Sequence, residues 1–111
     1  MSGQDLFLEL RAKQQLLETS LAALGKRGRD SANAEQTYRV ALAKKILEER
    51  EKGTPVTIIS DVCRGDKEIA RLKFERDVAE VSYSAAMEAI NIYKLAIRTL
   101  DEQINREWNR A

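Results

Sequence analysis

The chain has 111 residues, of which 33% are charged and 43% are apolar, with one proline and five glycines. This length favours a single domain with a modest core, and so few helix breakers favour a small number of long amphipathic helices. The 19 basic and 18 acidic side chains exclude a global field that attracts polyanions, so nucleic-acid binding would require local clusters of cations.

Three features of the composition bear on the cellular location. The single cysteine, Cys63, excludes an intramolecular disulfide, and the polar first five residues carry no signal-peptide pattern. No apolar run reaches the roughly 20 residues that a membrane span requires. We therefore expect a protein of a reducing cytoplasm that does not insert into membranes.

The first predicted helical arm covers residues 5–52, with Asp5 as its N-cap. A heptad pattern with one polar interruption runs along its first half, through Phe7, Leu10, Gln14, Leu17, Leu21 and Leu24. The two glycines of segment 25–29 each cost about 1 kcal/mol in a helix. This segment is therefore predicted as a bend in a continuing helix or, alternatively, as a turn. Gly53-Thr54-Pro55 would end the arm.

A short connecting helix is predicted over residues 55–64, with Thr54 as its N-cap, Pro55 at its first position and Gly65 at its end. Its apolar side chains are expected to face the core, namely Ile58, Ile59, Val62 and Cys63. Because the chain has no histidine to activate a thiol, Cys63 is interpreted as a small core side chain rather than a nucleophile.

The longest predicted helix covers residues 66–109, is capped by Asp66 and would be roughly 65 Å long at a rise of about 1.5 Å per residue. One apolar line keeps three-four spacing almost to Trp108, through Ile69, Leu72, Ala79, Tyr83, Ala86, Ile90, Tyr93, Ile97, Leu100 and Ile104. A second line widens the apolar stripe beyond what one partner helix covers, and consists of Phe74, Val78, Val81, Ala85, Ile92 and Leu95.

These elements predict an all-α fold, a long antiparallel helical hairpin with coiled-coil character, folded as one domain over residues 1–111. The wide apolar stripe predicts a homo-oligomer, because self-association is the simplest way to cover it. The expected oligomer interface consists of Tyr83, Ile90, Tyr93, Ile97, Leu100, Ile104 and Trp108.

The sequence lacks the residues on which most catalytic mechanisms depend. Without histidine there is no imidazole base and no histidine metal ligand, and no glycine-rich phosphate loop follows a predicted strand. Glu48, Glu49 and Glu51 alternate with basic residues, which predicts a solvated helix face rather than an acid-base pair or a metal site. We expect a protein that is not an enzyme and has no cofactor and no metal.

Two clusters of basic residues stand out, one in segment 25–29 and one around Arg39, Lys44 and Lys45. A hairpin would gather cations of both arms near its connector, and such a surface can hold a phosphate backbone without reading bases. The candidate nucleic-acid-binding residues are Lys26, Arg27, Arg29, Lys44, Lys45, Arg64, Lys67 and Arg71. The alternative is that these cations pair with neighbouring carboxylates, namely Asp66, Glu68 and Glu75, and form a solvated surface.

Residues 40–47, VALAKKIL, resemble a motif of the phage recombination mediators of the UvsY type, in which a valine-alanine-leucine run is followed by basic residues and a leucine. The resemblance extends over residues 38–104 to a long C-terminal helix with an alanine-isoleucine step such as Ala89-Ile90 and a nearby lysine such as Lys94. It implies a ring-like homo-oligomer that assembles through its C-terminal helix and binds single-stranded DNA.

The resemblance also implies partners and contact residues. Proteins of that family load a recombinase onto DNA covered by single-strand-binding protein, in the cytoplasm of the bacterial host. Of the two basic residues with which the family motif contacts DNA, Lys45 matches one. Ala43 stands in place of the other, with Lys44 beside it.

Two classes of function follow as hypotheses. The first is a non-catalytic accessory protein of phage DNA recombination or replication, which oligomerises and tracks single-stranded DNA by charge neutralisation. The second is a protein-binding adaptor or inhibitor, or a coiled-coil structural component, whose apolar stripe docks a partner helix and which binds no nucleic acid.

Overall fold

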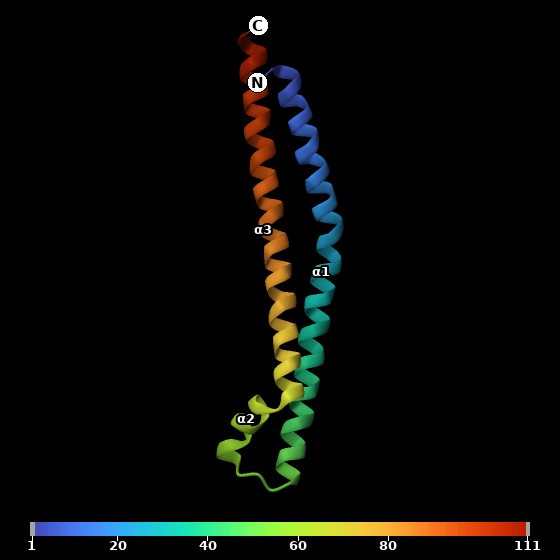
Figure 1. Ribbon diagram of the computed structural model, residues 1–111, viewed down its shortest axis with the longest axis vertical. Helices are drawn as coiled ribbons and strands as arrows, with labels where there is room; N and C mark the ends of the chain where they lie inside the picture. The colour runs from blue at the N-terminus through green and yellow to red at the C-terminus, as the bar shows by residue number, and fades with distance from the viewer. Residues whose placement is uncertain (1, 111) are drawn as a thin grey trace. The chain divides into compact units, whose positions relative to one another are not determined.

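A computed structural model describes residues 2–110, which form three α-helices and no strand (Figure 1). The helices are α1 (Gly3–Glu51), α2 (Val56–Gly65) and α3 (Lys67–Arg110). The all-α prediction is therefore confirmed. The helices build two compact units: unit 2 is Arg27–Tyr83, and unit 1 combines the part of α1 up to Lys26 with the part of α3 from Ser84 onward.

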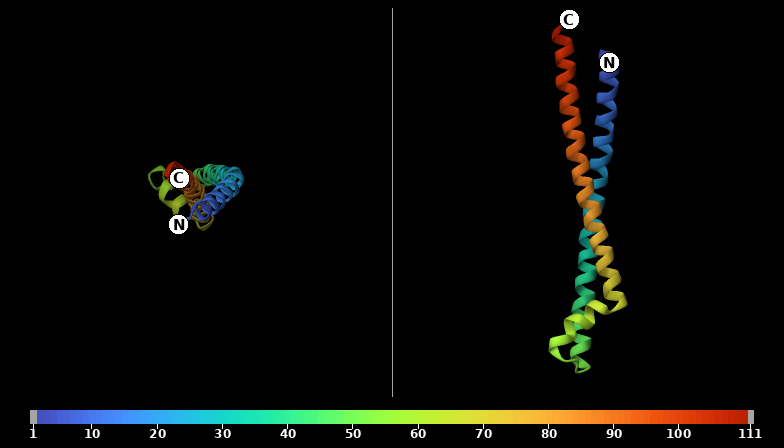
Figure 2. Two further views of the ribbon diagram at one scale, coloured as in Figure 1. Left: turned by 90° about the horizontal axis from the view of Figure 1, so that it is seen from above. Right: turned by 60° about the vertical axis from the view of Figure 1, so that its left-hand side comes forward.

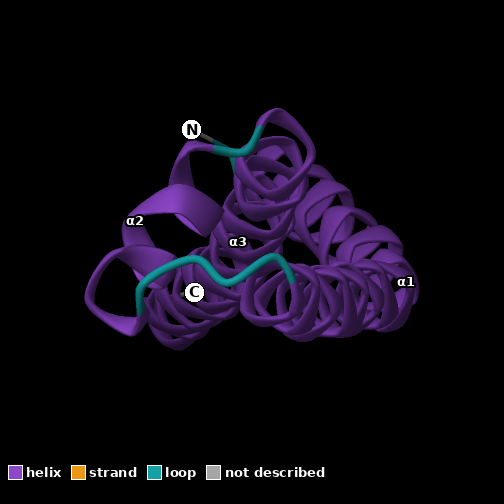
Figure 3. Ribbon diagram, turned by 90° about the horizontal axis from the view of Figure 1, so that it is seen from below, coloured by secondary structure: helices purple, strands orange, loops and turns teal. Residues whose placement is uncertain are grey.

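In each unit a segment of α1 pairs with an antiparallel segment of α3, as expected for a helical hairpin. The unit 2 segments lie side by side in both Figure 1 and Figure 2, where the green end of α1 accompanies the yellow start of α3. Unit 2 also contains α2, and Figure 3 shows the loop that joins α1 to it.

Helix α1 begins with a reciprocal pair of capping hydrogen bonds. The backbone N–H of Asp5 donates to the hydroxyl of Ser2 at 3.1 Å, and the N–H of Ser2 donates to Asp5 Oδ2 at 3.4 Å. The prediction that Asp5 is the N-cap is therefore wrong. Ser2 holds that position, and Asp5 stands three residues later as the second member of a capping box.

The glycines of segment 25–29 do not interrupt α1, so this segment is helical rather than a tight turn. Gly28 has a packing role there. A Cβ atom built at Gly28 would lie 3.0 Å from Cε2 of Tyr83, so the missing side chain leaves room for the tyrosine ring of α3. Close approach of the two helices in unit 2 explains a residue that helix propensity disfavours.

In unit 1, the buried side of α1 differs by one residue from the predicted pattern. Leu6 is 1% exposed, whereas the predicted Phe7 is 56% exposed and the predicted Leu21 is also exposed. The observed inner line keeps four-three spacing from Leu6 through Leu10, Lys13, Leu17, Ser20 and Leu24. Because Leu6 and Phe7 are both apolar, the inner line could begin at either residue. The observed line begins at Leu6 and includes two polar residues, Lys13 and Ser20.

The connector differs from its prediction at its start. Gly53 has a φ of 82°, which ends α1, and α2 begins at Val56 without a side-chain cap. Thr54 is therefore not the N-cap; its hydroxyl donates to Glu49 Oε2 at 2.6 Å instead. The carboxylate of Glu49 is close enough to accept the hydrogen bond of the hydroxyl that would otherwise cap α2.

Only two of the four apolar residues of α2 that were predicted to face the core do so. Ile59 is 6% exposed and Cys63 is buried, whereas Ile58 is 45% exposed and Val62 is also exposed. Residues four apart share one face of a helix, so Ile59 and Cys63 pack inward together and their neighbours point outward. The prediction that Ile58 and Val62 face the core is wrong.

Helix α3 follows its prediction closely. The Asp66 carboxylate accepts hydrogen bonds from the N–H groups of Glu68 and Ile69, both at 3.1 Å, and so caps the helix as expected. The first predicted apolar line is buried or half-buried at every position, and the second line is exposed at every position. The structure thus separates an inner face of α3, which packs against α1, from an outer apolar face.

Candidate interaction surfaces

A groove opens in unit 2 between all three helices and encloses about 760 Å³. Its buried lining includes Ile59 and Cys63 of α2 and Ile69 of α3, and its exposed lining includes Val56 and Phe74. A volume of this size, mostly apolar walls and a few polar side chains are typical of binding sites. We call this feature the three-helix groove.

The charged side chains of the three-helix groove are mainly basic. They include Arg50, Arg64 and Lys73, with Asp77 as a carboxylate among them. Lys73 Nζ lies 3.4 Å from Asp77 Oδ2, and Arg64 Nη1 lies 3.9 Å from Oδ1 of Asp61 in an exposed pair. Exposed pairs of this kind contribute little and are easily exchanged, so the groove has a cationic rim.

A buried carboxylate holds the connector of unit 2 in place. Glu49 is 6% exposed, and its Oε1 lies 3.4 Å from Lys45 Nζ and 3.6 Å from Lys52 Nζ. The hydrogen bond from the Thr54 hydroxyl, followed by the two lysines, keeps the pKa of Glu49 below its ordinary value. The prediction of a solvated face is therefore wrong for Glu49, because the loop after α1 folds back over it.

Lys45 links this carboxylate to α3. Its Nζ also lies 3.5 Å from Asp66 Oδ1, and its side chain is largely covered. Glu49 and then Asp66 raise the pKa of Lys45, whereas the Ile69 N–H and Lys45 lower the pKa of Asp66. Lys45, predicted to contact DNA, is thus engaged by two carboxylates of its own chain.

Arg71 is held in a similar way on α3. Its Nη2 lies 2.6 Å from Glu68 Oε1, and its Nη1 lies 2.6 Å from Glu75 Oε1. Both contacts raise the pKa of Arg71, with Glu68 as the larger cause. These are the pairings that the alternative interpretation of the basic residues predicts.

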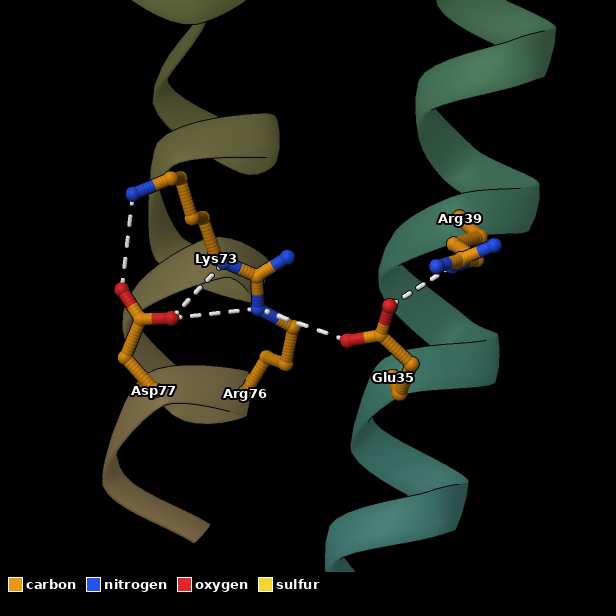
Figure 4. Close-up of polar contacts among 5 residues, drawn as sticks. All are labelled: Glu35, Arg39, Lys73, Arg76 and Asp77. Carbon is orange, nitrogen blue, oxygen red and sulfur yellow. Dashed lines mark hydrogen bonds and ion pairs between the residues drawn. The ribbon is translucent and has the colours of Figure 1, made fainter. Parts of the chain in front are cut away.

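A third network joins the helices of unit 2 and was missed from the sequence (Figure 4). Arg76 Nη2 lies 2.8 Å from Asp77 Oδ1, and Arg76 Nε lies 3.4 Å from Glu35 Oε2 across the helix pair. Glu35 also accepts from Arg39 at 2.6 Å, and the Arg76 guanidinium lies 4.7 Å from the centre of the Tyr38 ring. A signal was present, because Arg76 interrupts the inner apolar line of α3 between Leu72 and Ala79.

The other predicted nucleic-acid-binding residues are dispersed. Arg27 Nη1 donates to the Ser82 hydroxyl at 2.8 Å, and Lys26 belongs to unit 1. The remaining four are exposed, namely Arg29, Lys44, Arg64 and Lys67. Residues 27–83 contain 12 basic and 11 acidic side chains, so unit 2 as a whole has almost no net charge to attract DNA.

Unit 1 exposes a second apolar surface on α3. Ala85, Ile92 and Leu95 are exposed, and at 3.6 residues per turn they lie roughly half a turn of the helix from the buried Ile90. Residues 84–93 contain one charged side chain, Glu88, in a chain that is 33% charged. We call this surface the outer face of α3. Depletion of charge is typical of the centre of a protein interface.

The predicted oligomer interface lies mostly on the other side of α3. Ile90 and Leu100 are buried within the chain itself, and the remaining members are half-buried, namely Tyr83, Tyr93, Ile97 and Ile104. Trp108 is the exception, at 81% exposed. Of the predicted set, Trp108 alone is therefore exposed, and the other six residues pack at least partly within the chain.

A third apolar surface lies where α1 begins. Phe7 and Leu8 are both exposed and, with Ile104 and Trp108, line a hollow of about 610 Å³ in unit 1. Arg11 and Glu107 also line it.

Two further properties concern residues 2–110. No three of their cysteine and carboxylate side chains are grouped so as to hold a metal ion. None of the three helices combines the length and the hydropathy needed to cross a bilayer.

Comparison of the chain with protein-family models, with curated proteins and with solved structures finds no match. The class of protein that the geometry defines is an all-helical protein with exposed apolar surfaces and internally paired charges.

Proposed function

We propose that the protein acts without catalysis, as a homo-oligomer that assembles through the outer face of α3. One observation carries this proposal: exposed apolar side chains recur at heptad spacing on the side of α3 that faces away from α1. A partner helix recognises such spacing by inserting its own side chains between those of the row.

A second copy of α3 is a suitable partner, because the flanks of the outer face carry no charge between residues 84 and 96. Ser84 and Asn91 lie on one flank, and Ala89 and Ala96 lie on the other. Small, uncharged flanks allow two helices to approach without electrostatic repulsion. Ile92 and Leu95 would then supply the apolar contact.

The test is the mass of the purified protein by light scattering over a range of concentrations. The Leu95→Glu variant should be monomeric where the unchanged chain is an oligomer. Leu16→Glu is the matched control, since Leu16 is an exposed leucine of α1 in the same unit, and it should leave the mass unchanged. A monomeric unchanged chain, or equal effects of both substitutions, would exclude the proposal.

A second candidate function is binding of single-stranded DNA as an accessory protein of phage recombination, with a recombinase or single-strand-binding protein as partner. Besides the resemblance of residues 40–47, the exposure of Lys44 and Lys67 favours it. Asp66 and Glu68, which flank Lys67, already pair with Lys45 and Arg71, so Lys67 can reach a phosphate. Because Lys45 and Arg71 are paired with carboxylates of their own chain, this second candidate has less support than the first proposal.

Binding of labelled oligo-dT at low and high salt tests this second candidate. Lys44→Glu with Lys67→Glu should abolish a salt-sensitive complex, because such a complex depends on the release of counterions. Lys94→Glu, in unit 1, is the control. Absence of binding at low salt would exclude the DNA function and leave the self-association proposal intact.

A further inference from the structure

We propose that two copies of the chain pair through α3 in antiparallel orientation, about a two-fold axis near Met87. This inference rests on the proposed function, because it uses the same outer side of α3 and adds the orientation and alignment of the partner helix. The observation that carries it is a border of charged side chains whose signs are complementary to the same border read in reverse.

Two rows of α3 form this border. Helix α3 is continuous from Lys67 to Arg110, so the helical repeat determines which of its side chains share a face. The flank that contains Ser84 and Asn91 begins at Asp77 and continues to Arg98 at seven-residue spacing. The next row outward, at the same spacing, consists of Lys73, Glu80, Met87, Lys94 and Asp101. We call these two rows the charged border; Asp77 is half-buried, and the other eight residues are exposed.

The signs along the charged border reverse about Met87. Its pairs of opposite sign, at nearly equal distances on the two sides of Met87, are Lys73 with Asp101, Asp77 with Arg98 and Glu80 with Lys94. A row with this symmetry is complementary to itself when two helices run in opposite directions about a two-fold axis. An unrelated helix gains nothing from the symmetry, so the pattern selects a second copy of α3 as the partner.

Most charges of the border are not satisfied within one copy. Four of its side chains form no ion pair or hydrogen bond with any of residues 2–110, namely Glu80, Lys94, Arg98 and Asp101. Asp77 lies 2.8 Å from Arg76 in its own chain and 3.4 Å from Lys73. The contact with Lys73 is exposed, and such contacts contribute little and are easily exchanged.

The apolar side chains between the flanks fit the same axis. In the antiparallel pair, Val78 faces Leu95 of the second copy, and Val81 faces Ile92 of the second copy. All four side chains are exposed in one copy. Because an isologous contact is made twice, each of these apolar layers occurs twice in the pair.

Parallel pairing fits less well. It would place Glu88 against Glu88 of the second copy in the centre of the apolar contact, where like charges repel. In the antiparallel pair Glu88 faces Ala85, whose small side chain leaves room for the carboxylate to stay in water. Parallel helices would also bring the charged border against the opposite flank, in which Glu75 is the one charge among Glu75, Ser82, Ala89, Ala96 and Gln103.

The charges also determine the alignment of the antiparallel pair. A shift by one heptad in one direction places Lys73 opposite Lys94 of the second copy. A shift in the other direction places Glu80 opposite Asp101 of the second copy. Both shifts replace attraction by repulsion, whereas the apolar repeat alone would permit them.

Disulfide trapping between single-cysteine proteins tests the orientation. In a Cys63→Ala background, proteins carrying Val81→Cys and Ile92→Cys, both at exposed positions, are mixed in reductant and then oxidised. The mixed disulfide should form about tenfold faster than a disulfide between identical positions, because antiparallel pairing separates identical positions by roughly 16 Å along the axis. Faster cross-linking of identical positions overturns the inference.

The alignment is tested in the same way. Ala85→Cys or Thr99→Cys, each used in place of Ile92→Cys, would face position 81 after a shift of one heptad. Both should cross-link to position 81 more slowly than position 92 does. Faster cross-linking of either one overturns the proposed axis.

Charge reversal tests the border without cysteines. Glu80→Lys or Lys94→Glu alone brings like charges together twice in the pair and should raise its dissociation constant about fivefold, measured by light scattering over a range of concentrations. An equimolar mixture of the two variants should associate as tightly as the unchanged chain, since the facing charges are again opposite. A mixture that associates no more tightly than either variant alone overturns the inference. Circular dichroism of each variant verifies that it is folded.

Failure of this inference is distinguishable from failure of the proposed function. If the unchanged chain is monomeric, both are overturned. If it forms an oligomer that Leu95→Glu dissociates, while identical positions cross-link faster than position 81 with position 92, the proposed function stands and the antiparallel pairing is overturned.

Discussion

The hydroxyl of Thr54 donates a 2.6 Å hydrogen bond to Oε2 of Glu49, a carboxylate that the fold buries at the end of α1. Thr54→Val keeps the shape of the side chain and removes the donor, so Glu49 would lose its shortest contact. We expect the melting temperature to fall by several degrees, measured by circular dichroism. Thr57→Val, at an exposed position in α2, is the control and should have little effect.

Stability should decrease in acid. The pKa values of Glu49, Asp66 and Asp77 are lowered in the folded chain, by the Thr54 hydroxyl, the Ile69 N–H and Arg76 respectively. A carboxyl with a lowered folded pKa stabilises the fold above its unfolded pKa, and this contribution is lost as the pH falls through its folded pKa.

The free energy of unfolding, measured with urea, should therefore be constant near neutral pH and decrease below about pH 4.5, the ordinary pKa of a glutamate. Glu49→Gln should make this decrease shallower. An unchanged slope in that variant would show that Glu49 does not contribute to the acid dependence.

The two faces of α2 should respond differently to truncation. Ile59→Ala removes a buried side chain and should cost about 2–4 kcal/mol of unfolding free energy, as is typical of core positions. Ile58→Ala, at an exposed neighbour, should cost less than about 1 kcal/mol. Similar losses for both would mean that α2 packs in another orientation.

Gly28 and Tyr83 should be coupled. Replacing a helical glycine with alanine ordinarily stabilises a helix by about 1 kcal/mol, but the added Cβ would lie 3.0 Å from the Tyr83 ring. We expect Gly28→Ala to give no gain in the unchanged chain and most of the gain in a Tyr83→Ala background. A double-mutant cycle of unfolding free energies measures this coupling, and a full gain in both backgrounds would show that the ring moves freely.

Cys63 should be protected from thiol reagents. Its side chain is buried in the lining of the three-helix groove, so labelling requires local opening. Reaction with a colorimetric disulfide reagent should be at least tenfold slower in the native chain than in denaturant. Equal rates would mean that α2 does not stay docked.

The sequence predicts α3 well because its pattern is long and has a single phase. Ile69, Leu72, Ile90 and Leu100 recur at three-four spacing over several heptads, and the structure buries all four. The start of α1 is harder, since Leu6 and Phe7 are adjacent and either can begin the inner line. Only packing against α3 decides between them.

The polar features were less predictable because each depends on a partner that is distant in the sequence or that acts in an unexpected role. The pairing of Glu35 with Arg76 joins two helices, and although Arg76 interrupts the inner apolar line of α3, the sequence does not show which residue of α1 it meets. Thr54 follows the rule for a helix cap, yet its hydroxyl reaches back to Glu49. Local sequence rules describe caps, whereas the burial of a nearby carboxylate changes which acceptor a hydroxyl uses.

The contact between Glu35 and Arg76 also restricts how two long helices can align. Apolar side chains that repeat every seven residues permit a helix to slide by one heptad and still find apolar neighbours. In unit 2, a shift of seven residues along α1 would replace Glu35 by Gly28 or Leu42, and the guanidinium of Arg76 would lose its carboxylate across the pair. A single ion pair thus distinguishes one alignment from its neighbours, and the same requirement would oppose the pairing of this part of α3 with a helix that lacks the carboxylate.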